Sequence, residues 1–373
     1  MKRMNNLYYK ICDIDTIINM YDNEIKVNVR NKLKIEKFNN YYSINISKIK
    51  NILCGKNYIP GRYNIFLIRE PKYRIIMSQN IIDKVINHLV SKYFLINVFD
   101  KKLIKENTAT RVGKGTHYAL RLFKKYYNDY KIKYDKFYIL KFDINKYFYN
   151  IDHEVVKNII ERHIKDKNVL NIINNIIDST DDNYVNENIN ILKKKEIIKL
   201  KNSNLNNMDK NKRINEINNI PLYEKGKGFP IGNMSSQIVA TFYLNELDHF
   251  IKNELKIKGY IRYMDDGILF YENRYYLEYC LDKLKKLLDK YKLKLNKKTR
   301  IYCSNEEMEF LGFRFINKNK IIMKVSNKTK KRFKKKIRKK YDCFNKYRSV
   351  RDSYIGHLKY GCCGNLVWKY LFH

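Results

Sequence analysis

The pattern of apolar and polar residues predicts two hairpins of short strands. Residues 61–77 alternate around Pro71, which is typical of a β-hairpin. Residues 260–271 predict a strand, a tight turn and a second strand, and their Asp-Gly pair has the chemistry of a hairpin turn. The run 136–144 is almost continuously apolar, which indicates a buried strand that ends at Asp143. A further strand pair is predicted over 300–323.

Apolar residues at helical spacing predict helices over most of the remaining chain. Residues 1–60 are polar and mixed, with partial helix expected. The predicted helices cover 79–99, 116–127, a segment containing Val155, Ile159 and Ile160, 234–255, and 276–292.

Two segments stand apart by composition. Of the 37 residues in 183–219, twelve are Asn, and we interpret this segment as a low-complexity surface insertion, with an RNA-contacting loop as the alternative. Residues 324–340 hold eleven Lys or Arg and no acidic residue. Phe333, Ile337, Tyr341 and Phe344 still form one apolar stripe there, which predicts a docked amphipathic helix with a basic outer face.

The formal net charge of +39 favours a polyanionic partner, because lysine and arginine neutralise phosphates and release counterions. AT-rich codon usage is the alternative source of part of the lysine excess. Seven cysteines without metal-binding spacing suit reduced thiols. With neither a signal peptide nor a membrane-length apolar run, we expect a soluble cytoplasmic protein without membrane contact.

Three acidic residues lie where predicted strands end. Asp143 closes the apolar strand, and Asp265 and Asp266 lie at the tip of the second hairpin. Adjacent strands would bring the carboxylates together, where they repel one another unless cations neutralise them, and hard oxygen ligands suit Mg²⁺. Two such ions about 3.5–4 Å apart can perform nucleotidyl transfer. Taken singly, an Asp at a strand end or an Asp-Asp-Gly turn is usually structural, so the hypothesis depends on their conjunction.

The order of several motifs resembles that of reverse transcriptases, over roughly residues 55–360. REPKYRII (69–76) and ATRVGKGTHYAL (109–120) resemble the two fingers motifs, and KFDINKYFYNIDH (141–153) resembles motif A. GFPIGNMSSQ (228–237), YMDD (263–266), LNKKTRIY (295–302) and FLGFRF (310–315) resemble motif B, the signature box, motif D and the primer grip. Four letters such as YMDD arise easily by chance, whereas seven motifs in order do not.

The resemblance implies an α+β fold, the right-hand polymerase, in which an antiparallel palm sheet packs on helices. It implies an N-terminal extension (1–60), fingers (61–135), a palm (136–315, with the insertion at 183–219) and a small basic helical thumb (316–373). About 58 residues follow the last motif. We expect a minimal thumb from them, without ribonuclease H, endonuclease or maturase domains.

The resemblance also implies metal ligands and a catalytic acid. Asp143, Asp265, Asp266 and the backbone carbonyl of Ile144 are the expected ligands of two Mg²⁺ ions, for which Mn²⁺ can substitute. Lys298 would protonate the pyrophosphate, with Lys297 an equal candidate.

For the incoming dNTP, the resemblance implies a pocket built from several motifs. Phe148 would exclude the ribose 2′-hydroxyl as a steric gate, or else belong to the core. Lys72 and Arg74, which alternate with Tyr73 and so share a strand face, would bind the triphosphate, or else form a solvated face. Motif B adds Ile231, Gly232 and Gln237. Gly232 would allow close backbone approach to the template or primer.

The resemblance also implies which residues contact the template and the primer. Phe310, Leu311 and Gly312 would form the primer grip. The expected contacts to an RNA template and a DNA or RNA primer come from the following basic residues: Lys114, Lys331, Arg332, Lys335 and Lys339.

Motif B departs from the common pattern. Most reverse transcriptases have Gln-Gly and then Ser-Pro, whereas this chain has Ile231-Gly232 and Ser236-Gln237. This variant, and SYIGHLKYG at 353–361, resemble the enzymes of diversity-generating retroelements, which copy a template repeat with errors at adenines and work with a small basic accessory protein. An antiviral-defence reverse transcriptase acting with a structured non-coding RNA is the main alternative. A non-catalytic RNA-binding protein on a polymerase scaffold is a remote one, because no metal carboxylate is lost.

Overall fold

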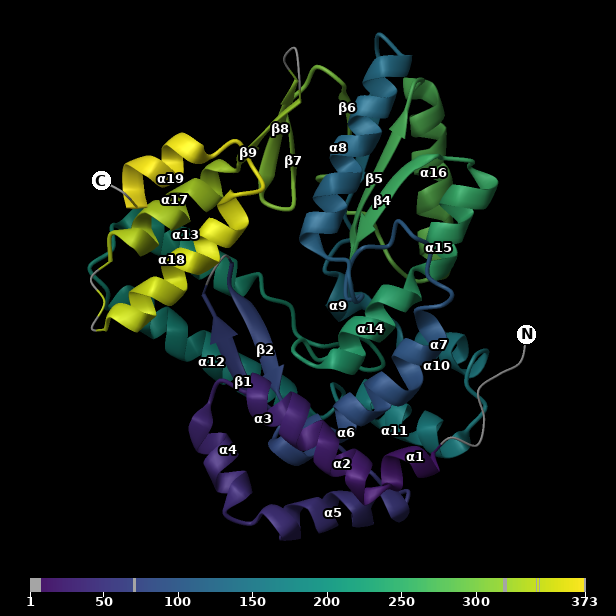
Figure 1. The fold of residues 1–373 in the computed structure, drawn as a ribbon, viewed down its shortest axis with the longest axis vertical. Coiled ribbons are helices and arrows are strands. Elements are labelled where there is room, and N and C mark those ends of the chain that lie inside the picture. Colours follow the sequence, from purple (N-terminus) through teal and green to yellow (C-terminus); the bar gives the residue numbers. More distant parts are fainter. Residues whose placement is uncertain (1–7, 70–71, 318–320, 340, 342, 372–373) are drawn as a thin grey trace. The chain divides into compact units, whose positions relative to one another are not determined.

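The computed structural model describes residues 8–69, 72–317, 321–339, 341 and 343–371 (Figure 1). The chain forms two compact units, each assembled from separate stretches of sequence. Unit 1 contains residues 1–104, 144–248 and 286–295, and unit 2 contains residues 105–143, 249–285 and 296–373. Each unit is described by itself below. No helix among the described residues is both long enough and apolar enough to cross a membrane.

The N-terminal part of unit 1 is helical as far as a two-stranded hairpin. Its helical segments are α1 (Tyr9–Cys12), α2 (Ile14–Met20), the π-helix η1 (Tyr21–Ile25), α3 (Lys26–Asn28), α4 (Lys32–Asn39) and α5 (Tyr42–Cys54). Strands β1 (Asn64–Ile68) and β2 (Arg74–Ser78) then pair antiparallel, which confirms the first predicted hairpin. Its predicted turn residue, Pro71, lies outside the described residues.

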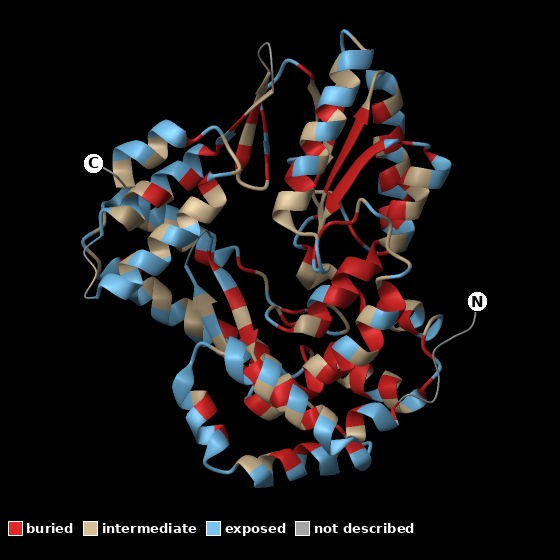
Figure 2. Cartoon of the chain, in the orientation of Figure 1, coloured by how far each residue is buried: buried red, intermediate tan, exposed pale blue. Residues whose placement is uncertain are grey.

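Two further helices of unit 1, α6 (Ile81–Val90) and α14 (Met234–Tyr243), pack against each other and are mostly buried, as Figure 2 shows for α14. α6 continues as η2 (Ser91–Ile96) and α7 (Asn97–Phe99), so the predicted helix over 79–99 is confirmed. The others are α9 (Tyr147–Asn150), α10 (His153–Glu161), α11 (Lys167–Asp178), α12 (Asn183–Lys201) and α13 (Asn207–Asn218).

The Asn-rich segment was wrongly interpreted as low-complexity surface chain, because α12 and α13 cover most of it. Val185, Ile189 and Leu200 of α12 and Ile217 of α13 are buried, in one cluster with Tyr73, Ile75 and Met77 of the hairpin region. Arg69 pairs with Glu196 of α12 at 2.9 Å. The insertion therefore supports the hairpin on which Lys72 and Arg74 lie.

Unit 2 is built on a four-stranded antiparallel sheet in the order β4-β5-β3-β6. The strands are β3 (Tyr138–Phe142), β4 (Gly259–Tyr263), β5 (Asp266–Tyr271) and β6 (Arg300–Cys303). Helix α8 (Thr116–Lys133) lies along β4 and β5 (Figure 1) and buries Ala119, Leu120, Phe123 and Tyr127. Apolar runs without alternation form β3 to β5 because both faces of these strands are covered.

A second sheet and three helices complete unit 2. β7 (Met308–Phe310), β8 (Phe313–Asn317) and β9 (Ile321–Val325) form an antiparallel sheet, followed by α17 (Asn327–Ile337), α18 (Phe344–Leu358) and α19 (Gly364–Leu371). The predicted strand pair over 300–323 is therefore four strands in two sheets. Phe310, Phe313, Phe315, Phe333 and Leu358 share one core cluster with α8 and the first sheet.

Two predicted helices differ in extent. The helix expected over 234–255 is divided into α14, α15 (Asn245–His249) and the π-helix η3 (Phe250–Glu254), whereas α16 (Arg274–Lys290) matches the helix predicted over 276–292. The basic helix expected over 324–340 begins only at Asn327, because 324–325 belong to β9, and it ends at Ile337. Phe333 is buried as predicted, but Phe344 is 69% exposed, so the apolar stripe is shorter than expected.

Candidate active site

Strand pairing in unit 2 brings the three acidic residues together. The last pair in the register of β3 and β5 is Phe142 with Gly267, so the next residues along these strands are Asp143 and Asp266. Asp265 lies in the turn between β4 and β5, where Tyr263 pairs with Asp266. The predicted carboxylate cluster is thus present at one end of the sheet, within a single unit.

Burial and neighbouring carboxylates raise the pKa values of Asp265 and Asp266. Burial, followed by the charges of Asp266 and Asp143, raises the pKa of Asp265 well above its usual value, and its side chain is hydrogen-bonded to Asp143. Burial also raises the pKa of Asp266 to about 6, with a further increase from Asp143. Ionised carboxylates in this crowded, poorly hydrated position are unfavourable unless cations neutralise them. The donor set therefore fits divalent cations with oxygen ligands such as Mg²⁺.

Lys141, which the sequence analysis did not single out, is the cation beside this cluster. It lowers the pKa of Asp266 and so partly offsets the effect of burial. Its ammonium donates to the backbone carbonyl of Glu309 at 2.8 Å, which fixes the side chain between the two sheets of unit 2. A lysine in the middle of an apolar strand is the only sequence signal for it.

Arg262 is a second residue that sequence reasoning missed. It is fully buried in β4, and its guanidinium donates to the Met264 carbonyl in the turn at 2.7 Å. Its backbone carbonyl accepts from the amide and hydroxyl of Thr108, both at 2.9 Å. Arg262 therefore ties the turn that carries Asp265 to the loop before α8.

The turn is not made by Asp-Gly, contrary to the expectation from the sequence. Met264 and Asp265 form it, with Met264 in the left-handed region at φ +56°, whereas Asp266 and Gly267 already belong to β5. Gly267 serves packing instead, because a Cβ atom there would lie 2.1 Å from the Phe142 ring. The close approach of Phe142 to β5 requires a residue without a side chain.

We expect Gly267→Ala to lower the free energy of unfolding by several kcal/mol, at or above the roughly 1–3 kcal/mol typical of overpacked cores, because a rigid ring would have to move. Gly356→Ala is the matched control. Position 356 lies in α18 with no atom within 4 Å of the added Cβ, so alanine should be neutral or stabilise by up to about 1 kcal/mol. Thermal unfolding of both variants measures the difference. Equal midpoints would contradict this role of Gly267.

The backbone after β3 links Asp143 to the predicted motif D. The Asn296 amide donates to the Asp143 carbonyl at 2.7 Å, so the turn with Lys297 and Lys298 begins beside the end of β3. Both lysines are exposed, and the choice between them stays open. Ile144, the predicted backbone ligand, is buried and forms a bridge with Leu295. Its role stays a prediction.

Lys72 and Arg74 are exposed, and Tyr73 between them is buried. This agrees with the predicted alternation, in which both cations lie on one face of the hairpin. Their binding of a triphosphate stays a prediction.

Phe148 follows a buried neighbour in α9. The Tyr147 ring is buried and its hydroxyl donates to the Ala240 carbonyl, whereas Phe148 is half-buried. The Phe148 carbonyl accepts from the Phe229 amide at 2.7 Å, which fixes the backbone. Tyr147 is therefore the core aromatic at this place, and the Phe148 ring keeps an exposed part.

Motif B packs on the hairpin of unit 1. The Ile231 carbonyl accepts from the Met77 amide at 2.9 Å, and the Ile231 side chain is half-buried. Gly232 has φ +128°, and a Cβ atom would lie 3.0 Å from the Met77 carbonyl oxygen. Close contact with β2 therefore already requires glycine at position 232. The approach of template or primer, which the sequence suggested, would be a second reason. Gln237 is exposed in the first turns of α14.

The predicted primer grip is the tight turn of the β7–β8 hairpin. Phe310 is buried in the core of unit 2, whereas Leu311 and Gly312 form the turn with positive φ values of 48° and 84°. The Gly312 carbonyl accepts from the Ser326 amide at 2.8 Å, so the turn is anchored to the start of α17.

The basic residues predicted to contact nucleic acid differ in their exposure to solvent. Lys331, Lys335 and Lys339 are exposed, although Lys339 lies beyond the end of α17. Arg332 is half-buried and donates to the Thr329 hydroxyl at 3.3 Å. Lys114 is also half-buried, and its ammonium donates to the Lys105 carbonyl at 2.8 Å, so it stabilises its own loop.

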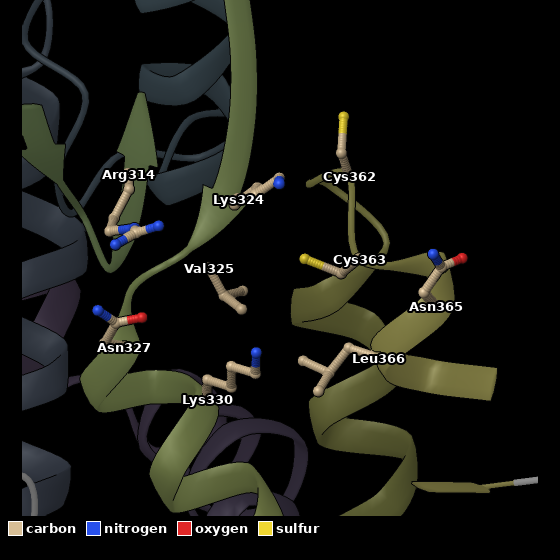
Figure 3. A pocket seen from close by; sticks show the side chains of 10 residues that line it. Arg314, Lys324, Val325, Asn327, Lys330, Cys362, Cys363, Asn365 and Leu366 are labelled. Carbon is tan, nitrogen blue, oxygen red and sulfur yellow. The ribbon is translucent and has the colours of Figure 1, made fainter. Parts of the chain in front are cut away.

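A cavity of about 480 Å³ lies between β9, α17 and the start of α19 (Figure 3). Arg314, Lys324 and Lys330 line it together with Cys362 and Asn365. Three cations beside one cavity extend the basic surface of α17, and the sequence analysis did not identify this cavity.

The family model described as reverse transcriptase (RNA-dependent DNA polymerase) matches residues 68–315. The chain belongs to the reverse transcriptase family. This confirms the predicted polymerase fold of mixed helices and antiparallel sheets. Among the curated proteins, no sequence matches.

Among solved structures, this reverse transcriptase is similar to apo telomerase from Candida tropicalis, truncated from its C-terminal domain. The two share 15% sequence identity with a TM-score of 0.47, over 71% of this chain and 55% of that chain. The present chain thus matches little more than half the length of that telomerase chain.

Proposed function

We propose that this chain is an RNA-directed DNA polymerase. The observation that carries the proposal is the cluster of Asp143, Asp265 and Asp266 at one end of the β4-β5-β3-β6 sheet, in a chain of the reverse transcriptase family. Its direct test is primer extension on an RNA template with dNTPs.

The three carboxylates would hold two Mg²⁺ ions, with the Ile144 carbonyl as a further ligand. Bound divalent ions supply activation of the primer 3′-hydroxyl and stabilisation of the leaving pyrophosphate. Arg262 holds the turn that carries Asp265, and Lys141 favours the ionised form of Asp266 by lowering its pKa. Lys298 or Lys297 would donate a proton to the pyrophosphate.

Substrate selection would come from residues of unit 1. Lys72 and Arg74, exposed on the supported hairpin of the fingers, would bind the triphosphate. The partly exposed ring of Phe148 would exclude a ribose 2′-hydroxyl. Residues 61–135 and 136–315 would then be fingers and palm, and residues 316–373 the thumb, with 1–60 as an N-terminal extension.

Template and primer would bind along the basic C-terminal elements. With a net charge of +39, the chain has ample lysine and arginine for phosphate neutralisation. The exposed lysines of α17 and the cations beside the cavity near α19 supply such a surface. The turn at Leu311 and Gly312 would contact the primer.

Neutralising Lys331, Arg332, Lys335 and Lys339 to glutamine should weaken template–primer binding and flatten its salt dependence. Each lost phosphate contact removes about 0.7–0.9 from the slope of log K against log salt. The expected total is at most about 3, because Arg332 is half-buried. Fluorescence anisotropy at several salt concentrations measures the slope.

The matched control neutralises four exposed lysines of the N-terminal helices α4 and α5, namely Lys32, Lys37, Lys48 and Lys50. It removes the same charge from a region without a proposed nucleic-acid contact. Equal salt-dependence slopes for the two variants would mean that the basic residues of α17 contribute only to the overall positive electrostatic potential of the protein and make no direct phosphate contacts.

We further propose that the enzyme copies a template repeat with frequent errors, as in a diversity-generating retroelement, together with a small basic accessory protein. The support is the motif B variant with Ile231 where most relatives have glutamine. The Ile231 side chain is half-buried and has no polar atom, so it cannot hydrogen-bond near the nascent base pair.

Ile231→Gln should reduce misincorporation, most of all opposite template adenine. A hydrogen bond contributes about 0.5–1.5 kcal/mol net, which corresponds to at most roughly a tenfold gain in discrimination. Sequencing of the cDNA counts the errors, and Ile231→Leu, which adds no polar group, is the control. Unchanged errors in the glutamine variant would show that any infidelity has another source, with Ile231 serving only to pack beneath the fingers.

A further inference from the structure

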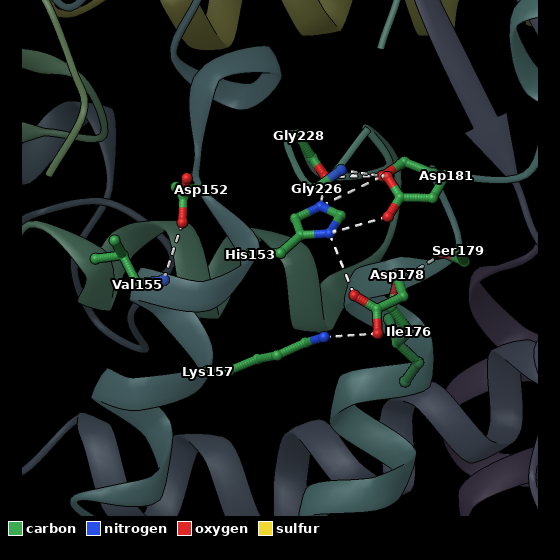
Figure 4. A network of polar contacts seen from close by, with 11 residues as sticks. Asp152, His153, Val155, Lys157, Ile176, Asp178, Ser179, Asp181, Gly226 and Gly228 are labelled. Carbon is green, nitrogen blue, oxygen red and sulfur yellow. Dashed lines mark hydrogen bonds and ion pairs between the residues drawn. The ribbon is translucent and has the colours of Figure 1, made fainter. Parts of the chain in front are cut away.

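A buried histidine of unit 1 faces two carboxylates at a place that the polymerase mechanism does not use. His153 begins α10, Asp178 ends α11, and Asp181 lies in the turn before α12. One nitrogen or oxygen atom from each residue lies within 4.8 Å of the others. Figure 4 shows the imidazole pointing at both carboxylates.

The tautomer of His153 follows from its other ring nitrogen. Nε2 lies 2.8 Å from the Gly228 carbonyl oxygen, which can only accept, so Nε2 carries the hydrogen. In the neutral ring, Nδ1 then has no hydrogen and presents a lone pair. The side chain is only 3% exposed, and Nδ1 has no hydrogen-bond partner although it points at two carboxylates. A lone pair in that position is unfavourable without a cation.

The distances fit a shared metal ion better than a shared proton. Nδ1 lies 3.2 Å from Oδ1 of Asp178 and 3.6 Å from Oδ2 of Asp181. Charge-assisted hydrogen bonds from an imidazolium are shorter, about 2.7–2.9 Å. Nitrogen and oxygen ligands at about 2.0–2.2 Å from a tetrahedral zinc ion are separated from one another by roughly 3.4 Å.

The contacts that the three residues make with neighbouring groups also match a metal site. The second oxygen of Asp178 accepts from the Lys157 ammonium at 2.6 Å, and the second oxygen of Asp181 accepts from the Gly226 amide at 2.9 Å. One oxygen of each carboxylate is thus free to face Nδ1. Partners of this kind, including a backbone carbonyl on the far nitrogen of the histidine, orient the ligands of metal ions. The lysine leaves one net negative charge to attract a cation.

We propose that His153, Asp178 and Asp181 bind a divalent transition-metal ion such as Zn²⁺, with water completing the coordination. Nitrogen ligation excludes Mg²⁺, so this site is chemically distinct from the carboxylate cluster of unit 2. Asp178 and Asp181 are 43% and 24% exposed, which gives an ion access. The ion stabilises the loop 226–228, where motif B begins, since Gly226 and Gly228 bond directly to the ligand residues.

The test uses the full chain after chelation, titrated with Co²⁺ in millimolar Mg²⁺, which occupies the oxygen-only site. The wild type should give the visible absorption of four-coordinate Co²⁺, without a thiolate charge-transfer band from the seven cysteines. Competition with Zn²⁺ then gives the affinity. Asp181→Asn should weaken binding more than about tenfold. Asp182→Asn, which changes the neighbouring exposed acid, should not.

His153→Gln is the second variant, because glutamine can keep a donor near the Gly228 carbonyl while removing Nδ1. It should fold yet lose the cobalt spectrum, and Zn²⁺ should raise the thermal midpoint of the wild type only. Equal cobalt spectra in the wild type and Asp181→Asn would overturn the site. So would absence of cobalt and zinc binding in the wild type.

Discussion

We expect Asp143→Asn and Asp265→Asn each to lower dNTP incorporation by at least about 10³-fold, while RNA binding should stay within a factor of a few. Activity should fall because each substitution removes one of the carboxylates proposed to hold the metal ions at the end of β3 and β5. Binding should persist because we expect it to depend on the basic surface and not on the cluster. Primer extension and anisotropy on the same preparations measure both quantities.

The folding of the variants is the control. Burial and neighbouring charges raise the pKa of Asp265, so in metal-free protein this carboxyl destabilises the fold increasingly from its unfolded-state pKa up to its raised folded-state pKa, and by a constant amount above it. Asparagine removes that charge. The thermal midpoint of metal-free Asp265→Asn should therefore equal or exceed that of the wild type. Near-normal primer extension by either variant contradicts the assignment.

We expect Phe148→Ala to admit ribonucleotides, with discrimination against rNTPs falling by at least about tenfold, or ~1.4 kcal/mol. The reason is that the partly exposed ring of Phe148 is lost while the buried Tyr147 still anchors α9. Ratios of kcat/KM for a dNTP and its rNTP measure the change.

Phe148→Tyr is the matched control, since it keeps the ring and should keep the discrimination. If alanine leaves rNTP exclusion unchanged, then Phe148 is a packing residue and the gate lies elsewhere.

The sheet of the candidate active site could be predicted because its strands are apolar on both faces. The runs ending at Asp143 and flanking Asp265 therefore stand out from the polar chain around them. The turn could not be placed correctly, because Asp-Gly is the usual hairpin signal. Only the structure shows that the Phe142 ring occupies the space beside Gly267.

Composition misled the interpretation of 183–219. Asparagine dominates the segment, yet Val185 and Ile189 are four residues apart and face the same cluster as the hairpin. Arg262 was missed for a similar reason. An arginine among apolar strand residues suggests a solvated position. The structure instead buries it, with its guanidinium bonded to the Met264 carbonyl and its backbone carbonyl bonded to Thr108, more than 150 positions away in the sequence.

RNA-templated extension by the wild-type chain tests the central claim most directly. The purified protein is given a defined RNA template, an annealed DNA primer, dNTPs and Mg²⁺, and the product is sequenced. The account predicts DNA complementary to the RNA, formed only with template and divalent metal present and absent with Asp265→Asn. Two results would contradict this account. One is that folded wild-type protein binds this template–primer but makes no template-dependent DNA, and the other is that Asp265→Asn makes as much product as the wild type.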